Sequence, residues 1–238
     1  MMTDSQRVGV RFRSIAVGAA LFGILCAYGA TTAVAADAPE QQMLVDKALL
    51  TVESFAADDG MKGALKELGK EAKALFIVPQ FMRGAFIFGG AGGSGLLLVK
   101  DEKTGKFGDP VFYNIGSASF GLQIGADVSE MILVVRTQKG LEEFYTNDFK
   151  LGANAGIAAG PVGAGVSAKG IAADIVAYAK KKGVFGGLAV DGSGITVSND
   201  SNKAYYGREV RPTDIVVKKE VGNPKALNLR NAADKLVD

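Results

Sequence analysis

The chain has 238 residues, of which 48% are hydrophobic and 32 are glycine, a composition that supports a buried core with tight turns and close-packed strands. It contains no histidine, which excludes hydrolase triads that use histidine as the general base. Its net charge of +2 gives no bulk argument for nucleic-acid binding, since such binding needs a concentrated basic face.

The N-terminal segment has the layout of a secretory signal peptide. Three arginines precede an apolar stretch over residues 15–27, and small residues follow it. This layout predicts cleavage after Ala35 or Ala36, with residues 1–35 as the signal peptide and residues 36–238 as a single mature domain. A membrane anchor is the alternative, but the apolar stretch is shorter than the about 20 residues that span a bilayer.

Cys26, the only cysteine, raises the alternative of a lipidated protein. Leu25 stands directly before it, where lipidation needs a small residue, so we expect no acyl chain. The mature chain would then lack cysteine and could form neither disulfides nor thiolate metal sites. Loss of the signal would remove three of the 27 basic and one of the 25 acidic residues, leaving 24 of each. We predict export to the periplasm or cell envelope, with peripheral membrane association.

Apolar residues recur at helical spacing from residue 41 to about residue 75, which predicts two amphipathic helices. The polar residues Asp58 and Asp59, followed by Gly60, separate them. They supply side chains that can cap the start of the second helix.

Beyond these helices, apolar residues alternate with small or polar ones, which is the period of β-strands. Residues 96–100 and 111–115 are predicted to form a hairpin through the polar, glycine-containing loop at 101–106. Residues 118–126 and 131–136 are predicted as the next pair of strands. The second of these is apolar on both faces and is therefore expected to be central.

Short elements are predicted for the second half of the chain. Residues 138–145 and 198–206 are expected to be helical, residues 175–180 and 184–190 to be strands, and residues 224–237 to form a last amphipathic helix. Successive antiparallel strands with helices outside them indicate an α+β fold. We expect N-terminal amphipathic helices packed on a curved, glycine-rich antiparallel sheet or barrel-like body, with a C-terminal helix.

Two glycine-rich segments have competing interpretations. Residues 90–95 match the dinucleotide fingerprint G-x-G-x-x-G, but a strand follows instead of a helix, so we interpret them as a glycine bend between two strands and expect no nucleotide site. Residues 151–168 are uncharged, with glycines at the four-residue spacing of packed membrane helices. Pro161 and Asn154 oppose that interpretation and favour small-residue strands in a tight sheet.

Carboxylate pairs are the remaining candidates for catalysis. Glu142 and Glu143 are adjacent in sequence, so on a helix they point about 100° apart, and acidic neighbours of this kind are typically solvated. A pair assembled from distant strands stays open, but no spacing in the sequence indicates one. We predict that the protein is not an enzyme and holds no cofactor or metal ion.

A row of lysines is the strongest anion-facing feature of the sequence. Four lysines recur every three or four residues on the second predicted helix and therefore share one side of it. They are Lys62, Lys66, Lys70 and Lys73. Arg83 is expected not far beyond the helix end, after a turn at Pro79. A solvated helix face is the alternative, since Glu67 and Glu71 alternate with the lysines and can pair with them.

Six sequence elements occur in an order that is typical of one known family. They are EAKALFIVP at 71–79, GGSG at 92–95, SFGLQIGA at 119–126, GPVG at 160–163, YAKKKGVFGG at 178–187 and NKAYYG at 202–207. With these elements the chain resembles the SYLF domain, a lipid-binding family that is also described as an actin-regulator domain in its eukaryotic members. The resemblance covers roughly residues 43–207 and leaves residues 208–238 as a C-terminal extension.

The resemblance implies membrane-lipid binding through basic residues and an amphipathic N-terminal segment, with phosphoinositides as ligands of the eukaryotic relatives. Lys73 would occupy the family's basic position before the element that ends at Pro79, and the three preceding lysines would be its helical approach. An exported chain without an SH3 or FYVE module meets neither actin nor phosphoinositides. We therefore expect an anionic glycerophospholipid as the ligand and no actin partner.

Two functions from different classes follow from the sequence. The first is an exported module that contacts anionic membrane phospholipid through its basic amphipathic helix. Its predicted lipid-binding residues are Lys62, Lys66, Lys70, Lys73 and Arg83. The second is a structural envelope protein that self-associates, or binds a protein partner, through a Gly/Ala-rich surface.

Overall fold

A nine-stranded, mostly antiparallel sheet is the central element of the residues that the computed structural model describes, which are 38–85, 88–120, 125–160, 170–181, 184–186 and 190–238. The strands are β1 (Ala74–Ala85), β2 (Phe88–Val99), β3 (Val111–Phe120), β4 (Gly125–Val135), β5 (Asp148–Lys150), β6 (Ile157–Ala159), β7 (Ile175–Lys181), β8 (Val184–Gly186) and β9 (Gly194–Val197). Their order is β5-β9-β3-β2-β1-β4-β7-β6, and β8 also pairs with β7.

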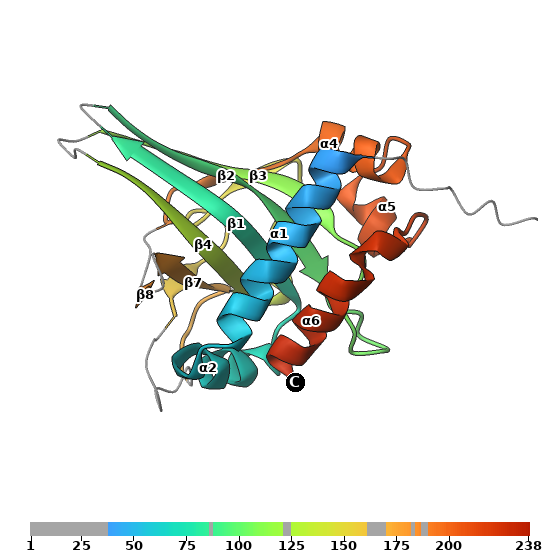
Figure 1. The fold of residues 1–238 in the computed structure, drawn as a ribbon, viewed down its shortest axis with the longest axis horizontal. Helices are drawn as coiled ribbons and strands as arrows, with labels where there is room; N and C mark the ends of the chain where they lie inside the picture. The colour runs from blue at the N-terminus through green and yellow to red at the C-terminus, as the bar shows by residue number, and fades with distance from the viewer. Residues whose placement is uncertain (1–37, 86–87, 121–124, 161–169, 182–183, 187–189) are drawn as a thin grey trace, which may run out of the picture. The chain divides into compact units, whose positions relative to one another are not determined.

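The four long strands β1 to β4 form a curved ribbon of sheet (Figure 1). Residues 74–78 of β1 and 131–135 of β4 are buried on both faces of the sheet. The prediction that residues 131–136 form a central strand is therefore confirmed, because β4 lies between β1 and β7.

Pro79 lies inside β1, and the predicted turn at this position is wrong. The register of β1 shifts there against both of its neighbours, which marks a bulge. Proline has no N–H to donate to a strand ladder, and a bulge is one of the places where a sheet accepts it. β1 therefore continues without a turn to Ala85.

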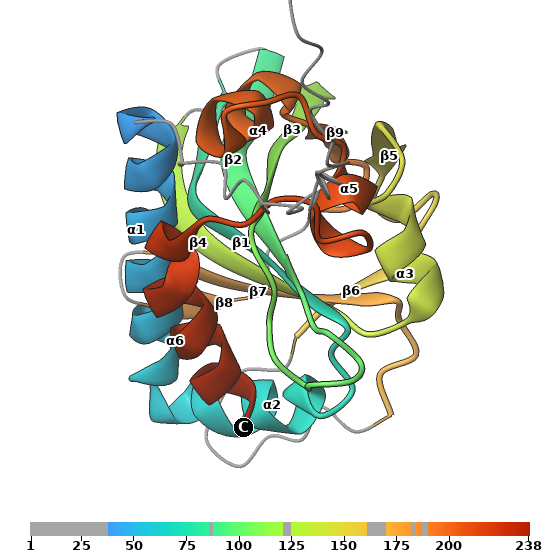
Figure 2. The ribbon, with the colours of Figure 1, turned by 90° about the vertical axis from the view of Figure 1, so that its right-hand side faces the viewer.

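A helix layer covers one face of the long strands (Figures 1 and 2). It consists of α1 (Pro39–Ala56), α2 (Asp59–Gly69) and α6 (Leu227–Val237). α1 and α6 lie side by side, and α2 packs against α6 closely enough that a Cβ on Gly69 would stand 2.2 Å from the Cβ of Val237. The apolar stripe of α1, with Val45, Val52 and Phe55, is buried. This arrangement confirms the predicted α+β fold, with N-terminal helices and a C-terminal helix on one sheet.

The remaining helices are short and follow β4 and β9 in the chain. They are α3 (Gln138–Glu143), α4 (Asn199–Tyr206), α5 (Pro212–Val216) and the 3-10 turn η1 (Pro224–Ala226). α3, α4 and α6 confirm three predicted helices, while α5, β5 and β9 were not predicted. Each of these three is five residues or shorter, which is too short for hydrophobic periodicity to reveal.

Asn202 fastens α4 to β3 from a fully buried position. Its Oδ1 accepts the N–H of Phe112 at 2.9 Å, and its Nδ2 donates to the carbonyl oxygens of Phe112 at 3.1 Å and Ser198 at 3.0 Å. The hydroxyl of Tyr206 donates to the carbonyl oxygen of Pro110 at 2.5 Å. The NKAYYG element of the sequence is therefore an anchor between α4 and the start of β3.

The predicted hairpin is confirmed, since β2 pairs antiparallel with β3 and Leu96 lies opposite Phe112. The strand predicted over residues 118–126 is wrong. Residues 118–120 end β3 and residues 125–126 begin β4, and these two strands are separated in the sheet by β2 and β1. Residues 121–124 lie outside the described residues, as do 161–169 of the Gly/Ala-rich stretch and 187–189 of the strand predicted at 184–190.

The G-x-G-x-x-G segment lies within β2, so the predicted bend between two strands is wrong. At two of its glycines, close packing on β1 leaves no room for a side chain. A Cβ on Gly93 would stand 2.3 Å from the carbonyl oxygen of Gln80, and one on Gly95 would stand 2.7 Å from the ring of Phe76. No helix N-terminus follows this segment to receive a pyrophosphate, because β2 continues to Val99.

Candidate functional site

α2 presents three of the predicted lysines to solvent. Lys62 and Lys66 lie on the helix and Lys70 is its C-cap residue, and all three side chains are exposed. They fall on one side because their four-residue spacing nearly matches the helical repeat. The opposite side is buried in the core through Met61, Ala64, Leu65 and Leu68.

The start of α2 is set by local chemistry that the sequence predicted. The carboxylate of Asp58 accepts the N–H groups of Gly60 at 2.9 Å and Met61 at 3.2 Å. The N–H of Gly60 lies in the first turn, where the cap satisfies it, and the N–H of Met61 also reaches the carbonyl oxygen of Asp58 at 3.1 Å. The buried apolar side and the capped first turn together hold α2 with its lysine-bearing side toward solvent.

Lys73 does not continue this row on the helix, and that part of the prediction is wrong. α2 ends at Gly69 and β1 begins at Ala74, so Lys73 lies in the link between them. Its backbone N–H donates to the carbonyl oxygen of Val135 at 2.8 Å, and its Nζ lies 3.2 Å from Oε1 of Glu102. Buried apolar residues lie on both sides of the link, so their spacing wrongly predicted that the helix continues through it.

Arg83 is separated from the lysines by most of β1. It stands ten positions after Lys73 along an extended strand, which at about 3.3 Å per residue places the two Cα atoms about 30 Å apart. Its partner across the β1–β4 ladder is Asp127. The structure therefore does not bring Arg83 to the α2 lysines. Lipid binding by the five predicted residues stays a prediction.

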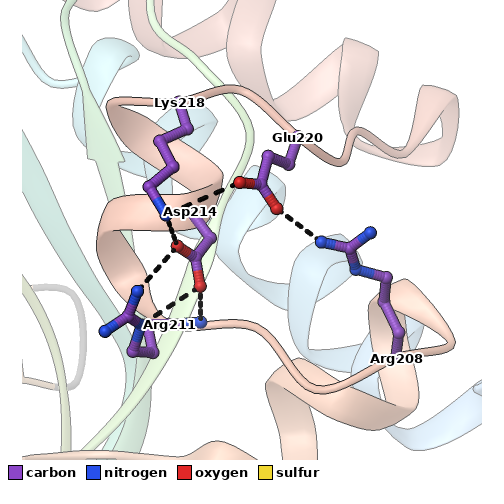
Figure 3. A network of polar contacts seen from close by, with 5 residues as sticks. All are labelled: Arg208, Arg211, Asp214, Lys218 and Glu220. Carbon is purple, nitrogen blue, oxygen red and sulfur yellow. Dashed lines mark hydrogen bonds and ion pairs between the residues drawn. The ribbon is translucent and has the colours of Figure 1, made fainter.

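A second group of basic residues surrounds α5, and its charges are engaged with carboxylates (Figure 3). Asp214 accepts hydrogen bonds from Nζ of Lys218 at 2.8 Å and Nε of Arg211 at 3.3 Å. Glu220 lies 3.6 Å from Nζ of Lys218 and 2.5 Å from Arg208. The hydrogen bond from Lys218, followed by that from Arg211, holds the pKa of Asp214 well below its usual range. Asp214 therefore stays ionised at neutral pH.

Other perturbed groups belong to the framework. The hydroxyl of Thr137 donates to Asp174 at 2.6 Å and the N–H of Gly156 donates to it at 2.8 Å, and together they lower the pKa of this carboxylate despite its partial burial. Burial raises the pKa of Tyr178 to about 12. Arg136 donates to Glu71 at 2.5 Å and to the carbonyl oxygen of Ile171, which links the segment before β1 to the segment before β7.

Among the described residues, no group of three or more His, Cys, Asp or Glu side chains could hold a metal ion. Within the same ranges, no helix has the length and apolar character needed to cross a bilayer.

The described residues form an α+β sheet domain in which three exposed lysines lie along one side of α2. The family model described as Ysc84, Las17-binding protein actin regulator, matches residues 116–236, and the chain belongs to this family. The resemblance to the SYLF domain is thereby confirmed. The family consists of non-catalytic domains associated with actin regulation and lipid binding.

Proteins from yeast and mammals are similar to part of this chain. LAS seventeen-binding protein 3 of Saccharomyces cerevisiae is 34% identical over 147 residues, which are 58% of this chain and 31% of that protein. Protein YSC84 of the same species is 28% identical over 172 residues, 68% of this chain and 36% of that protein. The human SH3 domain-containing YSC84-like protein 1 is 27% identical over 150 residues, 61% of this chain and 43% of that protein. The chain thus spans less than half the length of these relatives.

Proposed function

We propose that this chain is an exported domain of the Ysc84 family that binds anionic membrane phospholipid through the basic side of α2. The observation that carries the proposal is the set of three exposed lysines, Lys62, Lys66 and Lys70, on a helix whose other side is buried. A lysine close to an anionic membrane contributes about 1 kcal/mol, so three give a weak and reversible contact of about 3 kcal/mol. Lys73, beside Glu102, and the distant Arg83 would contribute less.

Vesicle binding tests this proposal. The expressed chain, isolated from the cells that make it, should sediment with vesicles of phosphatidylcholine and phosphatidylglycerol. The bound fraction should rise with the anionic content and fall as salt is added, because ions screen the lysine charges. A chain that binds neutral and anionic vesicles equally, or neither, would contradict the proposal.

Replacing Lys62, Lys66 and Lys70 by glutamine should weaken binding to anionic vesicles by up to about a hundredfold at low salt, from about 1 kcal/mol per lysine. The fold should survive, since exposed substitutions usually change stability by about 0.5 kcal/mol or less. A matched control replaces three exposed lysines on other elements by glutamine. They are Lys139, Lys150 and Lys203. Equal affinity of the two triple variants, both folded, would show that α2 is not the lipid site.

Export predicts a defined N-terminus. The mature protein should begin near Ala36 or Asp37 and carry no acyl chain, because the small residues before these positions fit a signal cleavage site and Leu25 does not fit lipidation at Cys26. Intact-mass and N-terminal peptide mass spectrometry of the protein from the cell envelope measure this. A diacylated species that starts at Cys26 would instead make the protein a membrane-anchored lipoprotein.

Protein binding is the second candidate function, and the family description favours it because it names Las17 binding and actin regulation. Self-association or a protein partner on the Gly/Ala-rich stretch is the form that the sequence suggests for an exported chain. Salt-insensitive self-association without vesicle binding would support this candidate over lipid binding. Co-sedimentation with actin filaments tests the actin regulation that the family description names, and export predicts that no co-sedimentation occurs.

A further inference from the structure

The glutamates of α2 lie on a different flank of the helix from its lysines. At about 100° per residue, Lys62, Lys66 and Lys70 fall within about 80° of one another around the helix axis. Glu67 and Glu71 fall within about 40° of each other on the neighbouring flank. The helical turn continues as far as Glu71, whose N–H donates to a backbone carbonyl oxygen at 3.1 Å. The basic and acidic side chains that alternate in the sequence are therefore separated in space.

The acidic flank of α2 faces β7 and the end of β4. Tyr178 of β7 is fully buried, and burial is the main reason why its pKa is raised. The negative charge of Glu67 raises this pKa further, and the positive charge of Arg136 opposes it. Both charges thus act on the same phenol, which places Glu67 on the side of α2 that faces Arg136.

Arg136 holds the second glutamate of this flank in an ion pair. Its Nη2 lies 2.5 Å from Oε2 of Glu71. The arginine is fixed in turn, because Nη1 donates to the carbonyl oxygens of Ile171 and Ala173 and the backbone N–H donates to that of Asp174 at 2.8 Å. The side chain of Arg136 is 15% exposed, whereas that of Glu71 is 64% exposed. An exposed carboxylate is thus tied to a buried, well-anchored cation.

The β1–β4 ladder brings Arg136 to the end of the lysine row. The N–H of Lys73 donates to the carbonyl oxygen of Val135 at 2.8 Å, and Arg136 follows Val135 directly. Arg136 therefore leaves the sheet beside the link between α2 and β1. Glu71 lies in this link, immediately after Lys70, so without its ion pair the carboxylate would stand next to the last lysine of the row.

We infer that Arg136 is a positioning residue for the lysine site, which holds Glu71 on the neighbouring flank and so keeps its carboxylate from neutralising the row at Lys70. This inference rests on the proposed function. Within the described ranges, Lys62, Lys66 and Lys70 take part in no ion pair, as the inference requires. A carboxylate released beside Lys70 would cancel about one of the three positive charges that attract an anionic surface.

Replacing Arg136 by glutamine should weaken binding to anionic vesicles about fivefold at low salt, which is the effect of losing one lysine charge. The difference from the parent should shrink as salt is added, because ions screen the released carboxylate. The matched control is R230Q. Arg230 likewise donates to a backbone carbonyl, at 2.9 Å, and lies 3.5 Å from a carboxylate, so R230Q should lose similar bonds but bind vesicles like the parent.

The double variant R136Q/E71Q separates positioning from a purely structural role. It has the net charge of the parent and no carboxylate to release, so its vesicle affinity should return to within about twofold of the parent. The bonds from Arg136 to the 170–174 segment are still missing in it, so a structural defect would persist. If R136Q binds as tightly as R230Q, or if the double variant stays as weak as R136Q, the inference is wrong and the proposed function stands. Absence of vesicle binding by the parent would overturn the proposed function itself.

E71Q alone gives a measurement that leaves the buried arginine in place and applies even if R136Q does not fold. The side chain of Glu71 is largely exposed, so this variant should keep the stability of the parent. The ¹³Cε signal of Lys70 in the NMR spectrum should stay at its parent position, because Glu71 is not the partner of Lys70. A shift of this signal would show that Glu71 already pairs with the lysine row and would overturn the inference.

Discussion

Replacement of Asn202 by alanine should lower the free energy of unfolding by about 3 kcal/mol. The substitution removes the two hydrogen bonds that join α4 to Phe112 of β3 and the one to Ser198 at the start of α4, and it leaves the buried N–H of Phe112 without its acceptor. An unpartnered buried donor costs about 1–3 kcal/mol, and each lost hydrogen bond adds about 1 kcal/mol or less. Urea unfolding followed by circular dichroism measures the change, with an unchanged slope showing that both variants unfold alike.

Asn114 supplies the matched control for this substitution. It lies on the same strand, β3, but is exposed, and its Oδ1 accepts one hydrogen bond, from Ser94 at 3.0 Å. N114A should cost no more than about 0.5 kcal/mol. If N202A is no less stable than N114A, the NKAYYG element does not anchor α4 to β3.

Replacement of Gly93 by alanine should destabilise the protein by about 3 kcal/mol or prevent folding. The added Cβ would stand 2.3 Å from the carbonyl oxygen of Gln80 and 3.2 Å from its carbonyl carbon. Both atoms are backbone within β1, at the bulge that also holds Pro79, so no flexible side chain can move aside. Overpacking of this kind costs about 1–3 kcal/mol or more.

Gly90 belongs to the same G-x-G-x-x-G segment and offers the comparison. A Cβ there would meet only the carbonyl oxygen of Ser117, at 3.9 Å, which is ordinary contact. G90A should therefore change the urea midpoint little, whereas G93A should lower it strongly. Equal tolerance of both substitutions would show that close packing is not what requires glycine at position 93.

Several features of this protein could be predicted from the sequence because they depend on neighbours along the chain. The helical spacing of the first two helices, the cap at Asp58 and the polar loop between β2 and β3 act within a few residues. The order of glycine, tyrosine and lysine elements was specific enough to identify the family without a structure. The lysines at positions 62, 66 and 70 share one exposed side for the same local reason.

Other features were decided only by the tertiary structure. Lys73 leaves the lysine row because the chain passes from helix to strand at a point where both are buried, so the apolar spacing continues through the change. Arg83 is distant from the α2 lysines because β1 accommodates Pro79 in a bulge between its two partner strands and continues beyond it. Gly93 and Asn202 have roles set by backbone atoms of β1 and β3, far away in the sequence.

Val128 shows the same limit from the opposite direction. It is 49% exposed, whereas Ile132, an apolar residue on the same face of β4, is buried. Whether such a residue is covered depends on where α1, distant in sequence, crosses the sheet. The sequence by itself therefore determined the local elements, the family and the basic side of α2. The packing of remote segments decided which charged and apolar side chains share a surface, because burial is a property of contacts between segments that the local pattern does not contain.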